Sequence, residues 1–99
     1  MGNYTFKKTK YMDNNRLAIL AYDNHEESGG MFAVVTTNLE DGLTLEDNMA
    51  YIDVNNSFQL GEMLQDKFEV IGEHRSGFVL YPLVKFDKEF IDSLEEAQN

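Results

Sequence analysis

The 99-residue chain contains no cysteine. This absence excludes disulfide bonds, thiolate metal ligands and a cysteine nucleophile, and it fits a protein of the cytoplasm. No apolar stretch approaches the roughly 18 residues that a membrane helix needs, and no apolar run of signal-peptide length follows the first lysines. We therefore expect a cytoplasmic protein without a membrane segment.

Basic residues are few: the chain has 8 Lys and Arg against 18 Asp and Glu, which gives a net charge of −10. Half of the basic side chains lie in the first 16 residues, at Lys7, Lys8, Lys10 and Arg16, with Asp13 as the acidic neighbour. A short basic segment thus precedes an acidic body. Because an acidic surface repels phosphate, we do not expect binding to duplex nucleic acid.

The length of the chain predicts a single domain over residues 1–99, since so short a chain buries one core. Alternation of apolar and polar residues over 4–9 is typical of a half-exposed strand, and "MDNN" at 12–15 supplies turn residues. Residues 16–23 have no polar face over 17–21, which indicates a central strand covered on both faces or else a short helix. With the β-branched run "MFAVVTTNL" at 31–39, these segments predict three consecutive antiparallel strands.

The middle of the chain, 40–56, is irregular and carries five carboxylates. We expect an exposed loop there, with "MAYIDV" as a short extended piece. A helix over about 56–67 should follow, because Asn56 is a good cap and apolar residues recur at helical spacing from Leu60 to Phe68.

The chain has one proline, Pro82, inside "SGFVLYPLVKF". Proline has no N–H to donate to a sheet, so Pro82 requires an edge, a bulge or an outward-pointing position. This strand should therefore lie at the border of the sheet, or the sheet should break there. The preceding "EHRSG" is typical of a turn, and Asp87 is a good cap for the helix that follows it. The predicted fold is α+β: an antiparallel sheet of about four strands, with a helix over about 56–67 packed on it and a C-terminal helix over about 88–97.

Tyrosines are the most informative candidates for recognition, because they carry a polar tip on a large apolar body. Near two of them lie amide and charged side chains that offer donors and acceptors. The predicted binding residues are Tyr51, Asp53, Asn55, Asn56, Arg75 and Tyr81.

No motif in the sequence indicates catalysis, metal binding or cofactor binding. His25 and His74 lack a paired metal-ligand spacing, the glycines form no phosphate-binding loop, and the acidic loop lacks the order of a calcium loop. We predict no catalytic residue, no metal site and no cofactor, and hence no enzyme.

Three segments, "FAVVTTNL", "AYIDVNN" followed by a helix, and "SGFVLYPLVKFD", together resemble a family of small acidic proteins. That family is a domain of unknown function from phages, plasmids and conjugative elements of Gram-positive bacteria, and the resemblance covers about residues 16–87. It implies a compact α+β domain and a mobile-element setting, and it carries no catalytic residues.

We therefore expect a non-enzymatic binding or accessory protein of a mobile element. It would act through an acidic, tyrosine-bearing surface on a basic host or mobile-element protein, and it would bind no membrane. Two alternatives stay open. One is weak binding of single-stranded nucleic acid by the basic segment, where aromatic residues interleave with lysines, and the other is a small metal-dependent enzyme that uses the carboxylates of 40–56.

Overall fold

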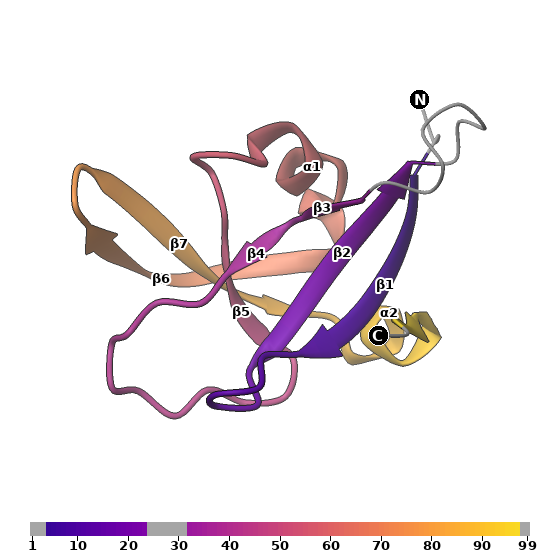
Figure 1. Ribbon diagram of the computed structural model, residues 1–99, viewed down its shortest axis with the longest axis horizontal. Helices are drawn as coiled ribbons and strands as arrows, with labels where there is room; N and C mark the ends of the chain where they lie inside the picture. Colours follow the sequence, from indigo (N-terminus) through magenta and orange to yellow (C-terminus); the bar gives the residue numbers. More distant parts are fainter. Residues whose placement is uncertain (1–3, 24–31, 98–99) are drawn as a thin grey trace.

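The computed structural model describes residues 4–23 and 32–97, and the loop predicted at 24–30 lies outside them (Figure 1). Within these residues the chain forms a mixed α+β fold of two four-stranded sheets and short helices, so the predicted fold class is confirmed. The first sheet has the order β3-β2-β1-β8, with bounds β1 Tyr4–Lys10, β2 Leu17–Asp23, β3 Phe32–Val34 and β8 Glu95–Glu96. The second has the order β4-β5-β7-β6, with bounds β4 Thr36–Thr37, β5 Met49–Ile52, β6 Phe68–Ser76 and β7 Val79–Phe86.

Strand β2 is the central strand that its apolar sequence predicts. It pairs antiparallel with β1 on one side and with β3 on the other, and residues 17–21 are all buried. The β1–β2 connection is the turn indicated by "MDNN". Asn15 adopts a left-handed φ of 60° there, a conformation that asparagine tolerates well.

The prediction of one strand over 31–39 is wrong for the part that is described, because Val35 divides it between the two sheets. β3 pairs with β2, whereas β4 pairs with β5. The Val35 N–H donates to Ile19 O at 2.8 Å, and Val35 O accepts from Asp53 N at 2.9 Å. One buried residue thus joins both sheets through its backbone.

The segment 68–76 follows the predicted helix and overlaps the turn predicted at "EHRSG", but it forms the long strand β6. Of the predicted turn residues only the last belongs to the turn: Gly77 has a φ of 64° and precedes Phe78 in a two-residue hairpin between Ser76 and Val79. A glycine with positive φ at the first turn position suits such a hairpin. A bulge at Ile71 shifts the register between Val70 and Gly72, which interrupts the period-two pattern that identifies a strand.

Strand β7, which contains Pro82, is not at the border of its sheet as predicted, because it lies between β5 and β6. Its pairing with β5 runs from Lys85 to Leu83 and stops there. From Pro82 toward the hairpin tip, β6 is the partner strand, with Glu73 opposite Pro82. The missing N–H of proline is tolerated because one side of β7 has become open at that residue.

The helices are shorter than predicted. α1 spans Phe58–Met63 and is followed by the 3-10 helix η2, Gln65–Lys67. The N-cap of α1 is Ser57 rather than Asn56, and the Ser57 hydroxyl donates to Val34 O at 2.8 Å. α2, Lys88–Ser93, begins after Asp87 as predicted, but it ends early because the next residues form β8 beside β1.

The core lies between the two sheets and is closed by the helices. Alternate residues of β2 face β5 and β7 across it, as expected for two sheets that pack face to face. Its buried members are Leu17, Ile19, Ala21, Val35, Ala50, Ile52, Leu64, Val84, Phe86 and Ile91.

We expect Gly61→Ala to destabilise the protein by about 1–3 kcal/mol, the usual cost of overpacking. A Cβ on Gly61 would lie 2.7 Å from Ile52 Cγ2, and Ile52 is buried in the core. This clash outweighs the gain of about 1 kcal/mol that alanine brings to a helix. Urea unfolding measures the change, with exposed Gln59→Ala as control. A Gly61→Ala protein as stable as wild type would contradict the close contact between α1 and β5.

Candidate functional site

The side chain of Tyr51, one of the predicted binding residues, is buried rather than presented to a partner. Its hydroxyl donates to the Asp41 carboxylate, and the same carboxylate accepts from the Arg16 guanidinium. Arg16 also donates to Leu39 O at 2.9 Å and to Leu43 O. These three side chains, Arg16, Asp41 and Tyr51, form what we term the Arg16 cluster.

The Arg16 cluster corrects the expectation that the whole acidic loop is exposed. The Asp41 side chain is 1% exposed and that of Arg16 is 8% exposed. Both oxygens of Asp41 have donors: Oδ2 accepts from Tyr51, and Oδ1 accepts from Arg16 and from Leu43 N, the latter at 2.9 Å. A buried ion pair requires such complete hydrogen bonding to offset desolvation, so the cluster fixes the fold of the loop between β4 and β5.

The environment of the cluster separates the pKa values of its two acids. Burial alone would raise the pKa of Asp41, but hydrogen bonds from Arg16, Tyr51 and the Leu43 N–H outweigh it and lower the pKa to about 2. Burial, with the hydrogen bond to the Asp41 carboxylate, raises the pKa of Tyr51 to about 12. At neutral pH the cluster therefore contains an ionised aspartate and a neutral tyrosine.

The three predicted binding residues on the β5–α1 connection form one turn. The Asp53 carboxylate accepts from Asn56 N at 3.1 Å and from Asn56 Nδ2 at 3.2 Å. Asn55 and Asn56 are exposed and line a shallow hollow with Tyr4 and Phe58. Asp53 thus organises the backbone before α1, and the two asparagine side chains remain beside the solvent.

The other predicted residues lie on the β6–β7 hairpin and on opposite faces of it. Tyr81 is opposite His74, and the His74 ring lies 6.1 Å from the ring of Tyr51, so these rings share one face. Arg75 is opposite Leu80 on the other face. The structure therefore divides the six predicted residues among three regions: one turn before α1, one face of the second sheet and the opposite face of the hairpin. Their role in binding stays a prediction.

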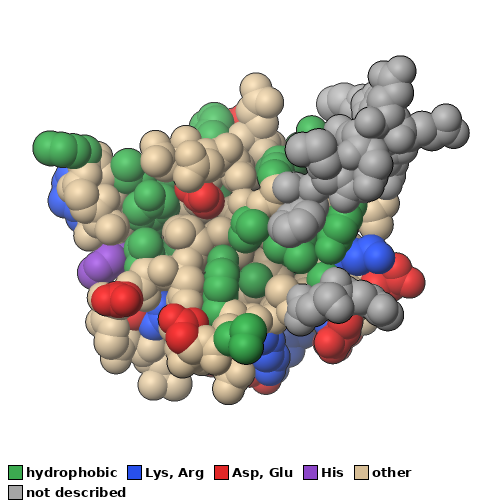
Figure 2. Space-filling view, viewed as in Figure 1, with side chains coloured by type: hydrophobic (Ala, Val, Ile, Leu, Met, Phe, Trp, Pro, Cys, Tyr) green, Lys and Arg blue, Asp and Glu red, His purple; other side chains and the backbone are tan. Residues whose placement is uncertain are grey.

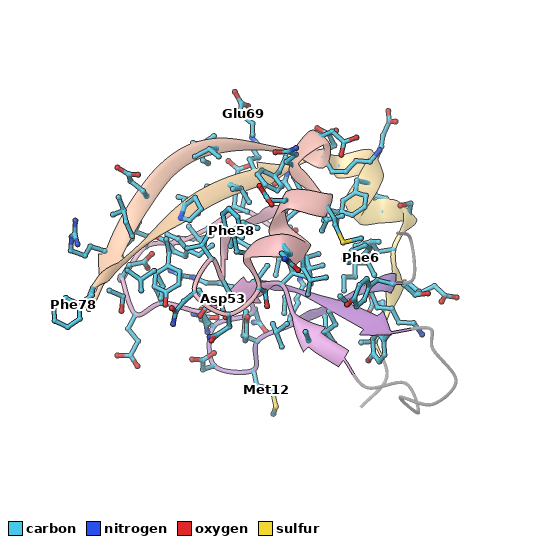
Figure 3. The ribbon with its side chains drawn as sticks, turned by 90° about the horizontal axis from the view of Figure 1, so that it is seen from above. Phe6, Met12, Asp53, Phe58, Glu69 and Phe78 are labelled. Carbon is cyan, nitrogen blue, oxygen red and sulfur yellow. The ribbon has the colours of Figure 1, made fainter. Side chains whose placement is uncertain are left out.

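The feature that the sequence did not indicate is an apolar groove between α1 and the β6–β7 hairpin. Its volume is about 380 Å³. In the view from above, the hairpin arcs away from the body, with Phe58 inside the arc and Phe78 at its far end (Figure 3). The groove is lined by Ile52, Val54, Phe58, Gly61, Glu62, Gln65, Phe68, Val70 and Pro82.

The groove exposes large apolar side chains to solvent. Phe58 is 55% exposed and Val70 is 58% exposed, and Ile71 and Leu80 are also exposed nearby on the hairpin. Among the described residues that line it, Glu62 carries the charge. Contiguous exposed apolar surface with a polar rim is typical of binding surfaces, so this groove is the candidate site.

Three of the five carboxylates of 40–56 contact other groups of the chain. Asp41 belongs to the Arg16 cluster, Asp53 organises a turn, and Glu46 Oε1 lies 3.4 Å from Lys85 Nζ. Within residues 4–23 and 32–97, no group of three or more His, Cys, Asp and Glu is placed to hold a metal ion. The geometry therefore offers no support for the metal-dependent alternative.

The basic segment is likewise engaged by its own chain. Lys7 Nζ lies 3.8 Å from Glu95 Oε1 and 5.4 Å from the centre of the Tyr22 ring. Lys8 Nζ donates to Ile91 O at 2.8 Å. Two of the lysines proposed for single-strand binding thus contact α2, β8 and β2 of their own chain rather than pointing into solvent, where they could bind phosphate.

The fold and the site define a small α+β domain with two four-stranded sheets and an apolar groove beside one helix. The chain belongs to the family described as a domain of unknown function, DUF4313, whose model matches residues 5–98. No curated protein and no solved structure matches the chain. In the described part of the chain, no helix is long and apolar enough to cross a membrane.

We expect Asp41→Asn to destabilise the protein by about 3 kcal/mol at neutral pH, because the buried Arg16 charge loses its counterion. The lowered pKa of Asp41 also makes wild-type stability depend on pH. This contribution is fully present above pH 3.8 and is lost as the pH falls through about 2, which corresponds to roughly 2 kcal/mol.

Urea unfolding at several values from about pH 5 to about pH 2 tests this dependence, because this range covers the ordinary titration of aspartate. The stability difference between wild type and Asp41→Asn should shrink as the pH falls. Asp47→Asn, the same change at an exposed residue of the same loop, should show no such trend. Equal pH profiles for the two variants would contradict the role of Asp41.

Proposed function

We propose that the protein is a non-enzymatic binding protein of a mobile element, and that its groove holds a basic amphipathic helix of a partner protein. The observation that carries this proposal is the groove itself, where exposed Phe58 and Val70 face solvent beside the carboxylate of Glu62. The mobile-element setting and the cytoplasmic location rest on the sequence, through the resemblance described above and the absence of cysteine.

Binding rather than catalysis is favoured by the chemistry of the lining. Catalytic sites usually contain groups whose pKa is strongly shifted. Within the described residues the clear shifts belong to Tyr11, Asp41 and Tyr51, and none of these three lines the groove. The groove offers apolar contact and one carboxylate, which suit a docked side chain better than a reaction.

Charge favours a basic occupant. Glu62 lines the groove, and Asp66 follows the lining residue Gln65 on η2 and is exposed. The chain as a whole carries a net charge of −10, which speeds the approach of a cationic partner. A basic segment therefore meets an attractive field both at long range and at the rim.

Shape favours a helix with one apolar face. The groove, at about 380 Å³, lies at the small end of ligand pockets, which usually enclose about 300–1,000 Å³. It accommodates a few apolar side chains rather than a whole partner. An amphipathic helix presents such side chains at positions i, i+3 or i+4, and i+7 as one ridge, and its flanking Lys and Arg would then lie beside Glu62.

A matched pair of synthetic helical peptides tests the proposal directly. Both carry the same leucine ridge, one with lysine and arginine on the polar face and the other with glutamate. We expect the basic peptide to bind and the acidic one to fail, as measured by fluorescence anisotropy or calorimetry. Phe58→Ala and Glu62→Lys should each weaken the basic peptide about tenfold, a loss of about 1.4 kcal/mol.

Glu89→Lys is the matched control, because it makes the same charge change at an exposed residue of α2 outside the groove. It should reduce affinity far less than Glu62→Lys. Far-ultraviolet circular dichroism and urea unfolding confirm that each variant is folded. Equal binding of the two peptides, or equal effects of Glu62→Lys and Glu89→Lys, would overturn the proposal, and binding of a small apolar dye alone would indicate a different occupant.

A further inference from the structure

Among the described residues, strand β6, Phe68–Ser76, is the border strand of the second sheet and pairs with β7 alone. It is nine residues long, so its outer side presents a long row of backbone groups without a partner strand in the described residues. Such an edge is a template for pairing with another strand. Natural edges are often protected by charged side chains or by bulges, and β6 has a bulge at Ile71.

The charges beyond that bulge do not have one sign. Glu73 and Arg75 lie opposite Pro82 and Leu80 on β7, which places both on the same face of the hairpin. Both are exposed, and neither forms an ion pair with another described residue. Acidic, basic and histidine side chains gather near this end of the molecule (Figure 2). Opposite charges two positions apart suit self-pairing in an antiparallel sense.

The register of such self-pairing is determined by these charges. An antiparallel pair centred on His74 sets Glu73 of each copy opposite Arg75 of the other, and cross-strand pairs of opposite charge are stabilising. Centring on Glu73 or on Arg75 sets like charges opposite each other. Centring on Gly72 includes the bulge, so that Glu69 and Arg75, which would be opposite each other, lie on different faces. Shifting one strand by a single residue relative to the other sets side chains of opposite faces against each other.

The same register also buries apolar surface. It sets Ser76 of one copy opposite Gly72 of the other, so the hairpin tip with Phe78 extends toward the end of β6 that carries Val70, and these side chains are 102% and 58% exposed in the single chain. Phe78 lies at the far end of the hairpin, clear of the body of its own chain (Figure 3). Two-fold symmetry makes each such contact twice.

We propose that two copies of this chain associate through antiparallel pairing of their β6 strands, centred on His74, as a symmetric dimer. The bulge-free segment 72–76 forms the shared ladder, and the second sheet of one copy becomes continuous with the second sheet of the other. The contact is small and each copy is strongly acidic, so the dimer is weak and dissociates on dilution. Dimer formation does not depend on the proposed binding of a basic helix, and it is measured without a peptide.

Sedimentation equilibrium from about 10 µM to about 1 mM, a range suited to weak association, tests the dimer. Wild type should show a monomer–dimer equilibrium. Glu73→Arg and Arg75→Glu should each be monomeric over this range, because each sets like charges opposite each other at two symmetric places. The double variant E73R/R75E restores opposite charges and should restore the dimer.

The matched controls make the same charge changes on α2, at exposed residues outside β6: Glu89→Arg and Lys88→Glu. They should leave the equilibrium within about threefold of wild type, as expected for surface changes away from a contact. A monomeric wild type at about 1 mM, a dimer that both single reversals leave intact, or a double variant that stays monomeric would each overturn the proposal.

A cysteine cross-link tests the register independently, since the chain has no cysteine of its own. His74→Cys sets two thiols directly opposite each other across the two-fold axis, at the roughly 4.5–5.5 Å Cβ separation of opposite residues. On mild oxidation it should form a disulfide-linked dimer faster than Glu69→Cys, an exposed position on the same strand that lies far from the axis. Equal rates for the two variants would exclude this register.

Discussion

The buried ion pair between Arg16 and Asp41 is the interaction on which the arrangement of the two sheets depends. Arg16 precedes β2 of the first sheet, Tyr51 lies on β5 of the second, and Asp41 is held by both. Charged groups so deeply buried are stable only when every donor and acceptor is satisfied. The loop between β4 and β5 must therefore follow one path, with its carbonyls at residues 39 and 43 turned toward the guanidinium.

The same constraint positions the groove on the opposite face of β5. Successive residues of a strand point to opposite sides, so when Tyr51 is held by Asp41, its neighbour Ile52 must point toward α1. Ile52 lies against Gly61 there and forms part of the groove. Glycine is required at this contact because a side chain would push α1 away from β5. The core of the second sheet and the groove thus both depend on the alternation of residues along β5.

Sequence reasoning succeeded where local pattern and packing agree: the apolar strand β2, the Asn15 turn and the start of α2 at Asp87 all follow from residue type and spacing. It failed where a long-range contact decides. The bulge at Ile71 concealed β6 by breaking its alternation, Val35 is shared by two sheets, and nothing in the spacing of Arg16 and Asp41 indicates that they meet. The groove was missed for the same reason, since β6 forms one of its walls.

The location of the acidic side chains decides which of them are available for recognition. Asp41 and Glu95 are committed to Arg16 and Lys7, whereas Glu62 lies at the groove and Glu73 on the outer strand of the same hairpin. A helix bound beside α1 and a second copy bound along β6 would both contact this hairpin, from its two sides. Any effect of binding at one surface on affinity at the other would have to be equal in both directions, and Val70, which lines the groove and belongs to β6, is the residue that borders both surfaces.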